Sequence, residues 1–384
     1  MPLNTTIHKV TACEQLQELF RQAQAEQTPV SLYRQPQSGG IELDFSDWKE
    51  IEVFDLDNLM VIVPPGILLK DLNAAAAAKG LRFIPGDTPL LENISIGEWA
   101  YRGCPNPSSW KYGAGKHFLL GAAYVLPNGD FTPVGGKCIK NVTGYDFTRF
   151  LTGAYADLAV GVQYIIKLMP QPVFRHRFDI TIASLASAIE LIGKLQARSV
   201  PPAWLFWADE QAGSKLFGGQ QQGQRIVFEL DGNETEVRSY QASLENLLPA
   251  GSVQQAPGSL PDLSHLDNET ANFWLCDEFK LPYQAVPAFS ARFQELRQTH
   301  GVTGGLFGQL ADGKIHLYLE QTDKAVVRPL ITALQQAAKE VGGTVSGKYD
   351  RLYGTGTTSP LVAMEVNFKK RIDPGLIYNR KEVG

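Results

Sequence analysis

GGKCIKNVTGYDFTRFLTG, which runs from Gly135 to Gly153, is the stretch of sequence that decides the fold. Its glycines are separated by short apolar runs and by polar side chains. Because glycine has no Cβ, the backbone at these positions can approach a flat or charged ligand closely. The stretch therefore predicts one wall of a cofactor site, shaped by Gly135, Gly136, Lys140, Asn141, Gly144, Tyr145 and Gly153. A glycine-rich turn between two core strands is the alternative.

The composition describes a globular chain with a nearly even mix of charges. The chain has 384 residues, of which 44% are hydrophobic, and this length predicts two packed domains rather than one. The 35 basic and 40 acidic residues give a net charge of -5. They form no long block of one sign, which argues against nucleic acid and anionic membranes as partners. No apolar run is long enough to cross a bilayer and the first residues lack a secretory pattern, so we expect a cytoplasmic protein.

The four cysteines do not form a metal-binding pattern. Cys13, Cys104, Cys138 and Cys276 are scattered along the chain, without a C-x-x-C pair or a histidine close by. An iron–sulfur cluster or a zinc site needs ligands at short, defined spacings. We therefore expect reduced, mostly buried thiols and no metal.

Hydrophobic periodicity predicts a β-α-β opening and further strands in the first half. Leu16, Leu19, Phe20 and Ala23 recur at helical spacing. A second helix of strong propensity is ended by Gly80, and MPQP at 169–172 predicts the end of the first domain. The expected elements are a helix at 13–26, a strand near 30–33, a strand pair within 51–66, a helix within 68–80, and strands at 118–125 and 158–168.

The second half predicts β-α-β units, which suggest an α+β cap. A polar loop at 249–268 interrupts them, and the tail predicts a short helix ended by Pro374. The expected elements are strands at 174–182, 204–208 and 224–230, helices at 185–195 and 236–248, a strand-like segment at 306–320, and a helix at 326–341.

The segment from about residue 120 to 172 resembles the flavin domain of the vanillyl-alcohol-oxidase type, the p-cresol-methylhydroxylase (PCMH) fold. More narrowly, GGKCIKNVTGYDFTRFLTGAYADLAVGVQYIIKLMPQP is similar to the small flavoprotein-like subunit of bacterial glycolate oxidase, and the resemblance returns at KKRIDPGLIYN. It implies an α+β fold: a two-subdomain PCMH-type FAD-binding domain at 1–172, an α+β, ferredoxin-like cap at 173–355, and a C-terminal segment at 356–384 that returns to the FAD domain.

The resemblance also implies a cofactor and a set of residues that would hold it. In this family FAD lies extended and non-covalently bound between the two halves of the first domain, and glycine-rich loops donate backbone N–H groups to its pyrophosphate. The residues that the resemblance places at the cofactor are Ser38, Gly39, Gly40, Asn93, Ser95, Gly135, Gly136, Lys140, Asn141, Gly144, Tyr145, Gly153 and Val160.

Three loops depart from the family pattern. The first carries bulky residues and Pro36, which has no N–H to donate. The second and third have lost glycines and carry Glu92 and Asp157, whose negative charges would repel a diphosphate. These departures favour an alternative, a flavin-free paralogue retained as a structural subunit.

The catalytic candidates are Tyr145 and His316. Related 2-hydroxy-acid dehydrogenases carry an H-x-G-D-G-N-x-H element in the cap. This chain reads QLADGKIH at 309–316, so the first histidine is missing and Gln309 stands in its place. His316 could deprotonate a hydroxyl beside a flavin, since imidazole titrates near neutrality. A histidine at the start of a strand after an Asp-Gly hairpin turn is the alternative.

The function that the resemblance implies is an FAD-binding oxidoreductase subunit of a glycolate oxidase-like 2-hydroxy-acid dehydrogenase complex. Its expected partners are a catalytic flavoprotein subunit and an iron–sulfur subunit, with a small 2-hydroxy acid as substrate of the complex. The chain itself has no ligand pattern that could carry electrons beyond a flavin.

Overall fold

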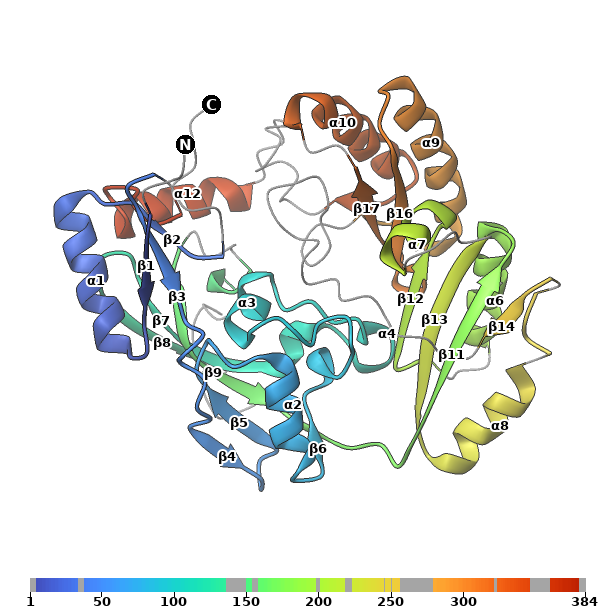
Figure 1. The fold of residues 1–384 in the computed structure, drawn as a ribbon, viewed down its shortest axis with the longest axis horizontal. Coiled ribbons are helices and arrows are strands. Elements are labelled where there is room, and N and C mark those ends of the chain that lie inside the picture. The colour runs from blue at the N-terminus through green and yellow to red at the C-terminus, as the bar shows by residue number, and fades with distance from the viewer. Residues whose placement is uncertain are drawn as a thin grey trace.

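The computed structural model of the chain describes residues 5–33, 38–135, 150–153, 158–197, 201–217, 223–244, 246–249, 251–255, 279–320, 323–345 and 360–379. The N-terminal half carries a three-stranded and a five-stranded sheet, and the C-terminal half carries one eight-stranded sheet (Figure 1). Most of the stretch from Gly135 to Gly153 lies outside the described residues.

The chain opens with the β-α-β unit that the sequence predicts. Strand β1 (Thr6–Lys9) and strand β2 (Val30–Ser31) both pair in parallel with β3 (Ile41–Asp44), so that β3 is central. Helix α1 (Cys13–Glu26) connects β1 to β2 and buries the four apolar side chains at helical spacing, Leu16, Leu19, Phe20 and Ala23. The crossover helix places these side chains in a core that the small sheet shares with the strands behind it.

The five-stranded sheet is antiparallel and forms the centre of the N-terminal half. Its order is β4-β5-β9-β7-β8. The strands are β4 (Val53–Asp55), β5 (Met60–Val63), β7 (Leu119–Val125), β8 (Phe131–Gly135) and β9 (Val160–Lys167). Strand β9 pairs with β5, which lies about a hundred residues earlier, and with β7, which lies about forty residues earlier. This pairing closes the half into one unit.

Short helices lie between β5 and β7. They are α2 (Leu69–Ala77), the 3₁₀ turn η1 (Ile84–Gly86), α3 (Ile96–Tyr101), α4 (Ser109–Tyr112) and η2 (Gly115–Phe118). Strand β6 (Leu81–Arg82) pairs with β10 (Met169–Pro170) at the point where the chain leaves the N-terminal half. The predicted strand pair within 51–66 and the helix within 68–80 are thus present, and FIPGDTP contains a 3₁₀ turn.

The eight-stranded sheet consists of two β-α-β-β-α-β units, each with the ferredoxin-like arrangement. The first unit contains β11 (Phe174–Ile182), α6 (Leu185–Ala197), β12 (Trp204–Ala208), α7 (Glu210–Leu216), β13 (Gln224–Gly232), α8 (Glu234–Leu244) and β14 (Val253–Gln255). The second contains β15 (Phe279–Lys280), α9 (Val286–Thr299), β16 (Gly304–Gln309), β17 (Lys314–Leu319), α10 (Lys324–Glu340) and β18 (Thr344–Val345). Strands β12 and β16 join the two units in antiparallel pairing.

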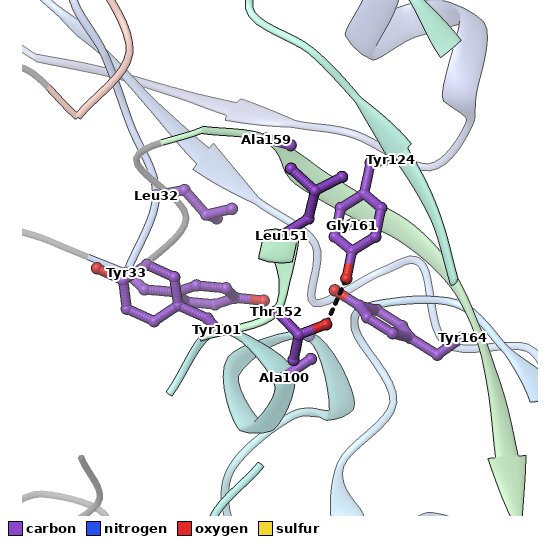
Figure 2. A pocket seen from close by; sticks show the side chains of 11 residues that line it. Leu32, Tyr33, Ala100, Tyr101, Tyr124, Leu151, Thr152, Ala159, Gly161 and Tyr164 are labelled. Atoms are coloured by element: carbon purple, nitrogen blue, oxygen red, sulfur yellow. Dashed lines mark hydrogen bonds between the residues drawn. The ribbon is translucent and has the colours of Figure 1, made fainter. Parts of the chain in front are cut away.

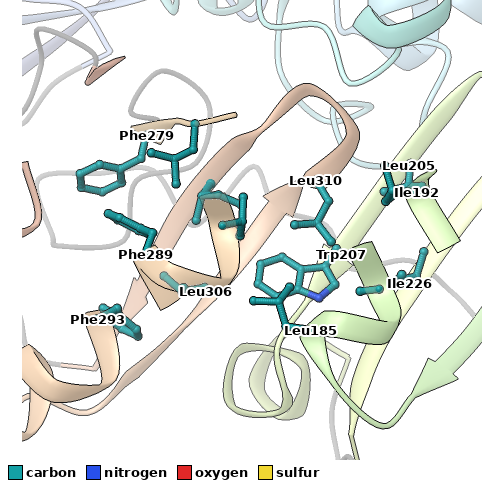
Figure 3. Close-up of a cluster of buried hydrophobic side chains, with 14 of the residues drawn as sticks. Leu185, Ile192, Leu205, Trp207, Ile226, Phe279, Phe289, Phe293, Leu306 and Leu310 are labelled. Carbon is teal, nitrogen blue, oxygen red and sulfur yellow. The ribbon is translucent and has the colours of Figure 1, made fainter. Parts of the chain in front are cut away.

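The two faces of this sheet have different neighbours. One face packs against α6, α9 and α10, and Figure 3 shows Trp207, Leu306 and Phe289 within that apolar core. The other face turns toward the N-terminal half, where Phe206 and Phe307 join the core of the first half. The strand-like segment expected at 306–320 is a hairpin of β16 and β17, and α9 is an additional helix.

The C-terminal end lies against the N-terminal sheet. Helix α12 (Pro360–Ile372) lies near β2 and α1 in Figure 1. Beyond it, the backbone N–H of Leu32 donates to the Asn379 side chain at 2.9 Å. Tyr378 is fully buried, and its ring meets Phe20 edge to face. The segment after Pro374 is therefore part of the core of the first half.

Candidate functional site

A crevice lies inside the N-terminal half, between the end of β2, helix α3 and the middle of β7 and β9. Figure 2 shows the side chains around it. The lining residues come from five separate segments: Leu32, Tyr33, Gly97, Ala100, Tyr101, Tyr124, Leu151, Thr152, Ala159, Gly161 and Tyr164. The open space that remains among them is about 20 Å³, which is roughly the room that one water molecule needs.

Small residues form two of the walls. A Cβ added at Gly161 would lie 1.9 Å from the Tyr164 hydroxyl, and one added at Gly97 would lie 2.5 Å from the Tyr33 hydroxyl. Ala100 and Ala159 continue these walls. The absence of larger side chains lets flat rings lie directly on the backbone, so the crevice is shaped for aromatic groups.

The polar groups of the crevice are neutral hydroxyls. Tyr124 and Thr152 share a hydrogen bond of 2.8 Å in the buried interior. Burial raises the pKa of Tyr124 and that of Tyr164 well above the ordinary value of a phenol. These phenols remain protonated at neutral pH, so they can hydrogen-bond to a ligand without adding charge.

Glu98 lies beside the crevice, whereas the sequence indicates Glu92. The backbone carbonyl of Glu92 accepts from the N–H of Lys70 at 3.1 Å, which holds this loop along α2. Glu98, next to Gly97 on α3, is paired with Arg102 at 2.6 Å. Any negative charge that Glu98 brings to the crevice is therefore balanced by a neighbouring guanidinium.

Asn93 and Ser95, the predicted cofactor residues of the second loop, make different contacts. Asn93 accepts a hydrogen bond from the Lys70 ammonium at 2.8 Å. Ser95 is the N-cap of α3, where its hydroxyl accepts from the N–H of Glu98 at 3.1 Å. The same hydroxyl is 3.3 Å from the Tyr33 hydroxyl, so of the two residues Ser95 lies closer to the crevice lining.

The other predicted cofactor residues lie around the crevice or outside the described chain. Ser38 and Gly39 are exposed, whereas Gly40 is buried and accepts from the N–H of Thr6. Gly135 ends β8, and Val160 begins β9 with its side chain fully buried in the core. A Cβ on Gly153 would lie 2.7 Å from the Gly103 Cα, so these backbones touch. Gly136, Lys140, Asn141, Gly144 and Tyr145 lie outside the described residues.

His316 lies on β17 in the sheet face that turns toward the N-terminal half. It is 3% exposed, and its ring stacks on Phe307 with centroids 5.4 Å apart. Gln309, which stands where relatives carry the first histidine, is also buried. His316 does not line the crevice described above, so its catalytic role remains a prediction.

Two further observations concern metals and membranes. Among the residues that the structure describes, histidine, cysteine, aspartate and glutamate form no group of three that could hold a metal ion. Cys104 is buried, and burial raises the pKa of its thiol. Within the same part of the chain, none of the helices is both long enough and apolar enough to span a bilayer.

The crevice in this conformation does not admit a flavin, although its walls suit one. The neutral hydroxyls and the small residues of α3 and β9 would accept a flat ring system. The space of about 20 Å³ is far below the several hundred that small-molecule pockets require. The Tyr33 side chain takes up room at the edge of the crevice.

Comparison with known proteins identifies two family models in the chain. The FAD binding domain matches residues 7–135, and the C-terminal domain of FAD linked oxidases matches residues 261–349. Glycolate oxidase subunit GlcD of Bacillus subtilis is 24% identical over 341 residues, which cover 82% of this chain and 72% of the relative. D-lactate dehydrogenase of Archaeoglobus fulgidus is 26% identical over 328 residues, covering 82% and 73%. Glycolate oxidase subunit GlcE of Escherichia coli is 27% identical over 225 residues, covering 58% and 62%.

Solved structures share the fold across nearly the whole chain. 4-ethylphenol oxidase from Gulosibacter chungangensis superposes with a TM-score of 0.71 at 13% identity, covering 96% of this chain and 87% of the other. p-Cresol methylhydroxylase superposes with a TM-score of 0.67 at 15% identity, covering 97% and 88%. The predicted α+β class, a two-subdomain PCMH-type domain followed by a ferredoxin-like cap, is confirmed. The chain thus has the PCMH-type fold, with an FAD binding domain and the C-terminal domain of FAD linked oxidases, and it is an FAD-linked oxidoreductase related to glycolate oxidases and D-lactate dehydrogenases, with FAD as its cofactor.

Proposed function

We propose that the chain is the FAD-binding subunit of a glycolate oxidase-like complex in the cytoplasm that oxidises a small 2-hydroxy acid. In this proposal residues 1–172 bind FAD, residues 173–355 form the cap, and residues 356–384 return to the FAD domain. A catalytic flavoprotein subunit and an iron–sulfur subunit complete the complex. The observation that carries the proposal is the aromatic crevice with glycine and alanine walls, inside the half that matches the FAD binding domain.

When bound, FAD supplies a two-electron acceptor for the oxidation of a hydroxyl-bearing carbon. The residues of this chain would hold and shield it. Gly97 would leave the backbone open to a flat ring once the Tyr33 hydroxyl beside it has moved, and the Tyr124 and Thr152 hydroxyls offer neutral hydrogen bonds. The buried cores on both sides limit the access of water to the crevice.

The residues of the cap favour an accessory role for this chain rather than an independent catalytic role. Gln309 stands where relatives carry the first of two histidines, and His316 stacks on Phe307 in a buried environment. An amide side chain has no basic lone pair comparable with imidazole, so it cannot replace that group in proton transfer. We therefore assign hydroxyl deprotonation to the catalytic partner subunit.

The narrowness of the crevice favours a second candidate, a flavin-free structural subunit of the same kind of complex. The two are separated by an absorbance spectrum of the purified chain before and after incubation with FAD and removal of free FAD. Flavin bands that stay with the protein support the proposal, and a colourless folded protein contradicts it. Co-expression with GlcD-type and iron–sulfur subunits, followed by size-exclusion chromatography, tests the complex independently of the flavin.

A further inference from the structure

Tyr33 has a strained backbone at the end of β2. Its φ is +56°, in the left-handed region that residues other than glycine rarely adopt. Such strain persists only where surrounding contacts hold the residue in place, and it is frequent at ligand clamps and switches. The contacts of Tyr33 should therefore stabilise its left-handed backbone conformation.

The described contacts of Tyr33 include the core that the small sheet shares with β7 and β9, and its polar and ring contacts come from Ser95 and Tyr101 at the two ends of α3, on the opposite wall of the crevice. The Tyr33 hydroxyl is 3.3 Å from the Ser95 hydroxyl, and its ring lies against Tyr101 with centroids 5.3 Å apart. Gly97 leaves the space that the Tyr33 hydroxyl occupies, since a Cβ there would lie only 2.5 Å away. Figure 2 shows the Tyr33 and Tyr101 rings together at one side of the crevice.

The Tyr33 side chain therefore occupies the same small-residue wall that suits a flavin. With it in place, the remaining space is about 20 Å³. Tyr124 and Tyr164 belong to strands β7 and β9 of the central sheet, so they cannot leave without breaking the core. Tyr33 lies at the end of a two-residue strand and is only partly buried, so it is the ring that can swing out.

We propose that Tyr33 is a gate of the flavin crevice: its side chain rests on α3 and must leave before FAD can enter. The proposal rests on the proposed function only in taking FAD as the ligand. The hydrogen bond to Ser95 and the contact with Tyr101 hold the gate closed, and the left-handed backbone gives it a conformation from which it can be released.

The test is FAD binding by the full chain, measured as quenching of flavin fluorescence in stopped-flow and equilibrium titrations. Three proteins are compared: wild type, Tyr33→Gly, which removes the ring and suits the left-handed backbone, and Tyr33→Phe, which keeps the ring but loses the Ser95 contact. If the open form is a tenth or less of the population, Tyr33→Gly binds FAD at least about tenfold more tightly than wild type. Tyr33→Phe gains about fivefold or less, the share of one hydrogen bond. Circular dichroism confirms that each variant is folded, and Tyr33→Ala replaces Tyr33→Gly if that variant is not.

Each outcome separates the gate from the proposed function. Stronger binding by Tyr33→Gly than by a wild type that also binds FAD supports both. Binding by Tyr33→Gly alone supports the gate and contradicts the flavoprotein function of the natural chain. Equal binding by wild type and Tyr33→Gly overturns the gate and leaves the function standing, whereas no binding by any folded variant overturns both.

Discussion

The guanidinium of Arg82 donates a hydrogen bond of 2.7 Å to the carboxylate of Asp231. Arg82 belongs to β6 in the N-terminal half and Asp231 to β13 in the eight-stranded sheet, so this contact joins the two halves. Arg82 also pairs with Asp87 at 2.9 Å, and Asp231 accepts from Lys111 at 2.5 Å and from Tyr112 at 2.8 Å. Both charged groups are almost completely buried, so the junction of the halves is a largely buried ionic cluster.

Removal of one member of this pair should be costly, because the other charge stays buried without its partner. We expect Arg82→Met to lower the free energy of unfolding by about 3 to 5 kcal/mol. The double variant Arg82→Met, Asp231→Leu should recover much of that loss, since it leaves no isolated charge. Urea unfolding measures both. Lys9→Met, which breaks an exposed pair with Asp47, is the matched control and should leave stability nearly unchanged. Equal, small effects of Arg82→Met and Lys9→Met would contradict the buried role of the cluster.

The contribution of Asp209 to the free energy of unfolding should depend on pH in the direction opposite to that of ordinary acid unfolding. Its carboxylate is the N-cap of α7 and accepts from the N–H groups of Ala212 and Leu306, each at 2.8 Å. Burial nevertheless raises its pKa above the ordinary 3.8, and the backbone donors offset this in part. Because the folded pKa is the higher one, the contribution of Asp209 is fully present below pH 3.8 and is lost as pH rises through the folded pKa.

Asp209→Asn isolates this effect, because the amide does not titrate. We expect the stability of wild type relative to Asp209→Asn to fall as pH rises from about 3.5 to about 6. Thermal unfolding of both proteins across that range measures the difference, and the other carboxylates cancel in it. A difference that is constant, or that grows with pH, would show that the carboxylate is not held in a raised-pKa state.

The spacing of apolar residues predicts those helices and strands that have one apolar face within a single continuous segment. The helix at 13–26 matches α1 residue for residue, since its apolar spacing decides which face is buried. Helix α9 was missed although Val286, Phe289, Phe293 and Leu296 recur on one face, because Pro287 and the polar residues between them obscured that stripe. The segment 306–320 is predicted as strand-like, with an Asp-Gly hairpin turn before His316 as the alternative, and the structure has this hairpin of β16 and β17 with Gly313 as the left-handed turn residue.

The candidate site was less predictable, because its walls come from distant segments. Tyr33, Gly97 and Gly161 line the crevice, and none of them is among the cofactor residues that the sequence predicts. Their neighbourhood depends on β9 pairing with both β5 and β7, a long-range contact without a local signal. The sequence names the Glu92 carboxylate of the second loop, and the structure adds Glu98, which follows the lining residue Gly97 on α3 and pairs with Arg102.

Gly161 should resist substitution more strongly than glycines in open positions. A Cβ there would lie 1.9 Å from the Tyr164 hydroxyl and 2.5 Å from its ring, and Tyr164 is 3% exposed, so it has little room to move. We expect Gly161→Ala to cost about 1 to 3 kcal/mol of unfolding free energy, and adding Tyr164→Leu should relieve part of that loss.

Gly193 provides the control for that variant. It lies within α6, and a Cβ there would meet nothing within 4 Å. Gly193→Ala should therefore stabilise the chain by about 0.5 to 1 kcal/mol through helix propensity. Chemical denaturation of the three variants gives the comparison, and a loss for Gly193→Ala as large as that for Gly161→Ala would contradict the packing argument.

The C-terminal segment should depend on one buried carboxylate. Asp373 is fully buried and accepts from the N–H groups of Ile377 and Tyr378 at 2.9 and 3.0 Å, and from the Gln24 side chain at 2.7 Å. It thereby folds the end of the chain back onto α1. Asp373→Ala leaves these buried donors without an acceptor, and we expect a loss of about 3 kcal/mol or more.

Asp373→Asn keeps one acceptor oxygen and the volume of the side chain, so it should lose clearly less than Asp373→Ala. Limited proteolysis followed by mass spectrometry should show cleavage of the C-terminal segment in Asp373→Ala well before the wild type is cut, because Ile377 and Tyr378 leave the core when their anchor is gone. If the segment of Asp373→Ala stayed as protected as that of wild type, apolar packing alone would hold it, and the carboxylate would not be its anchor.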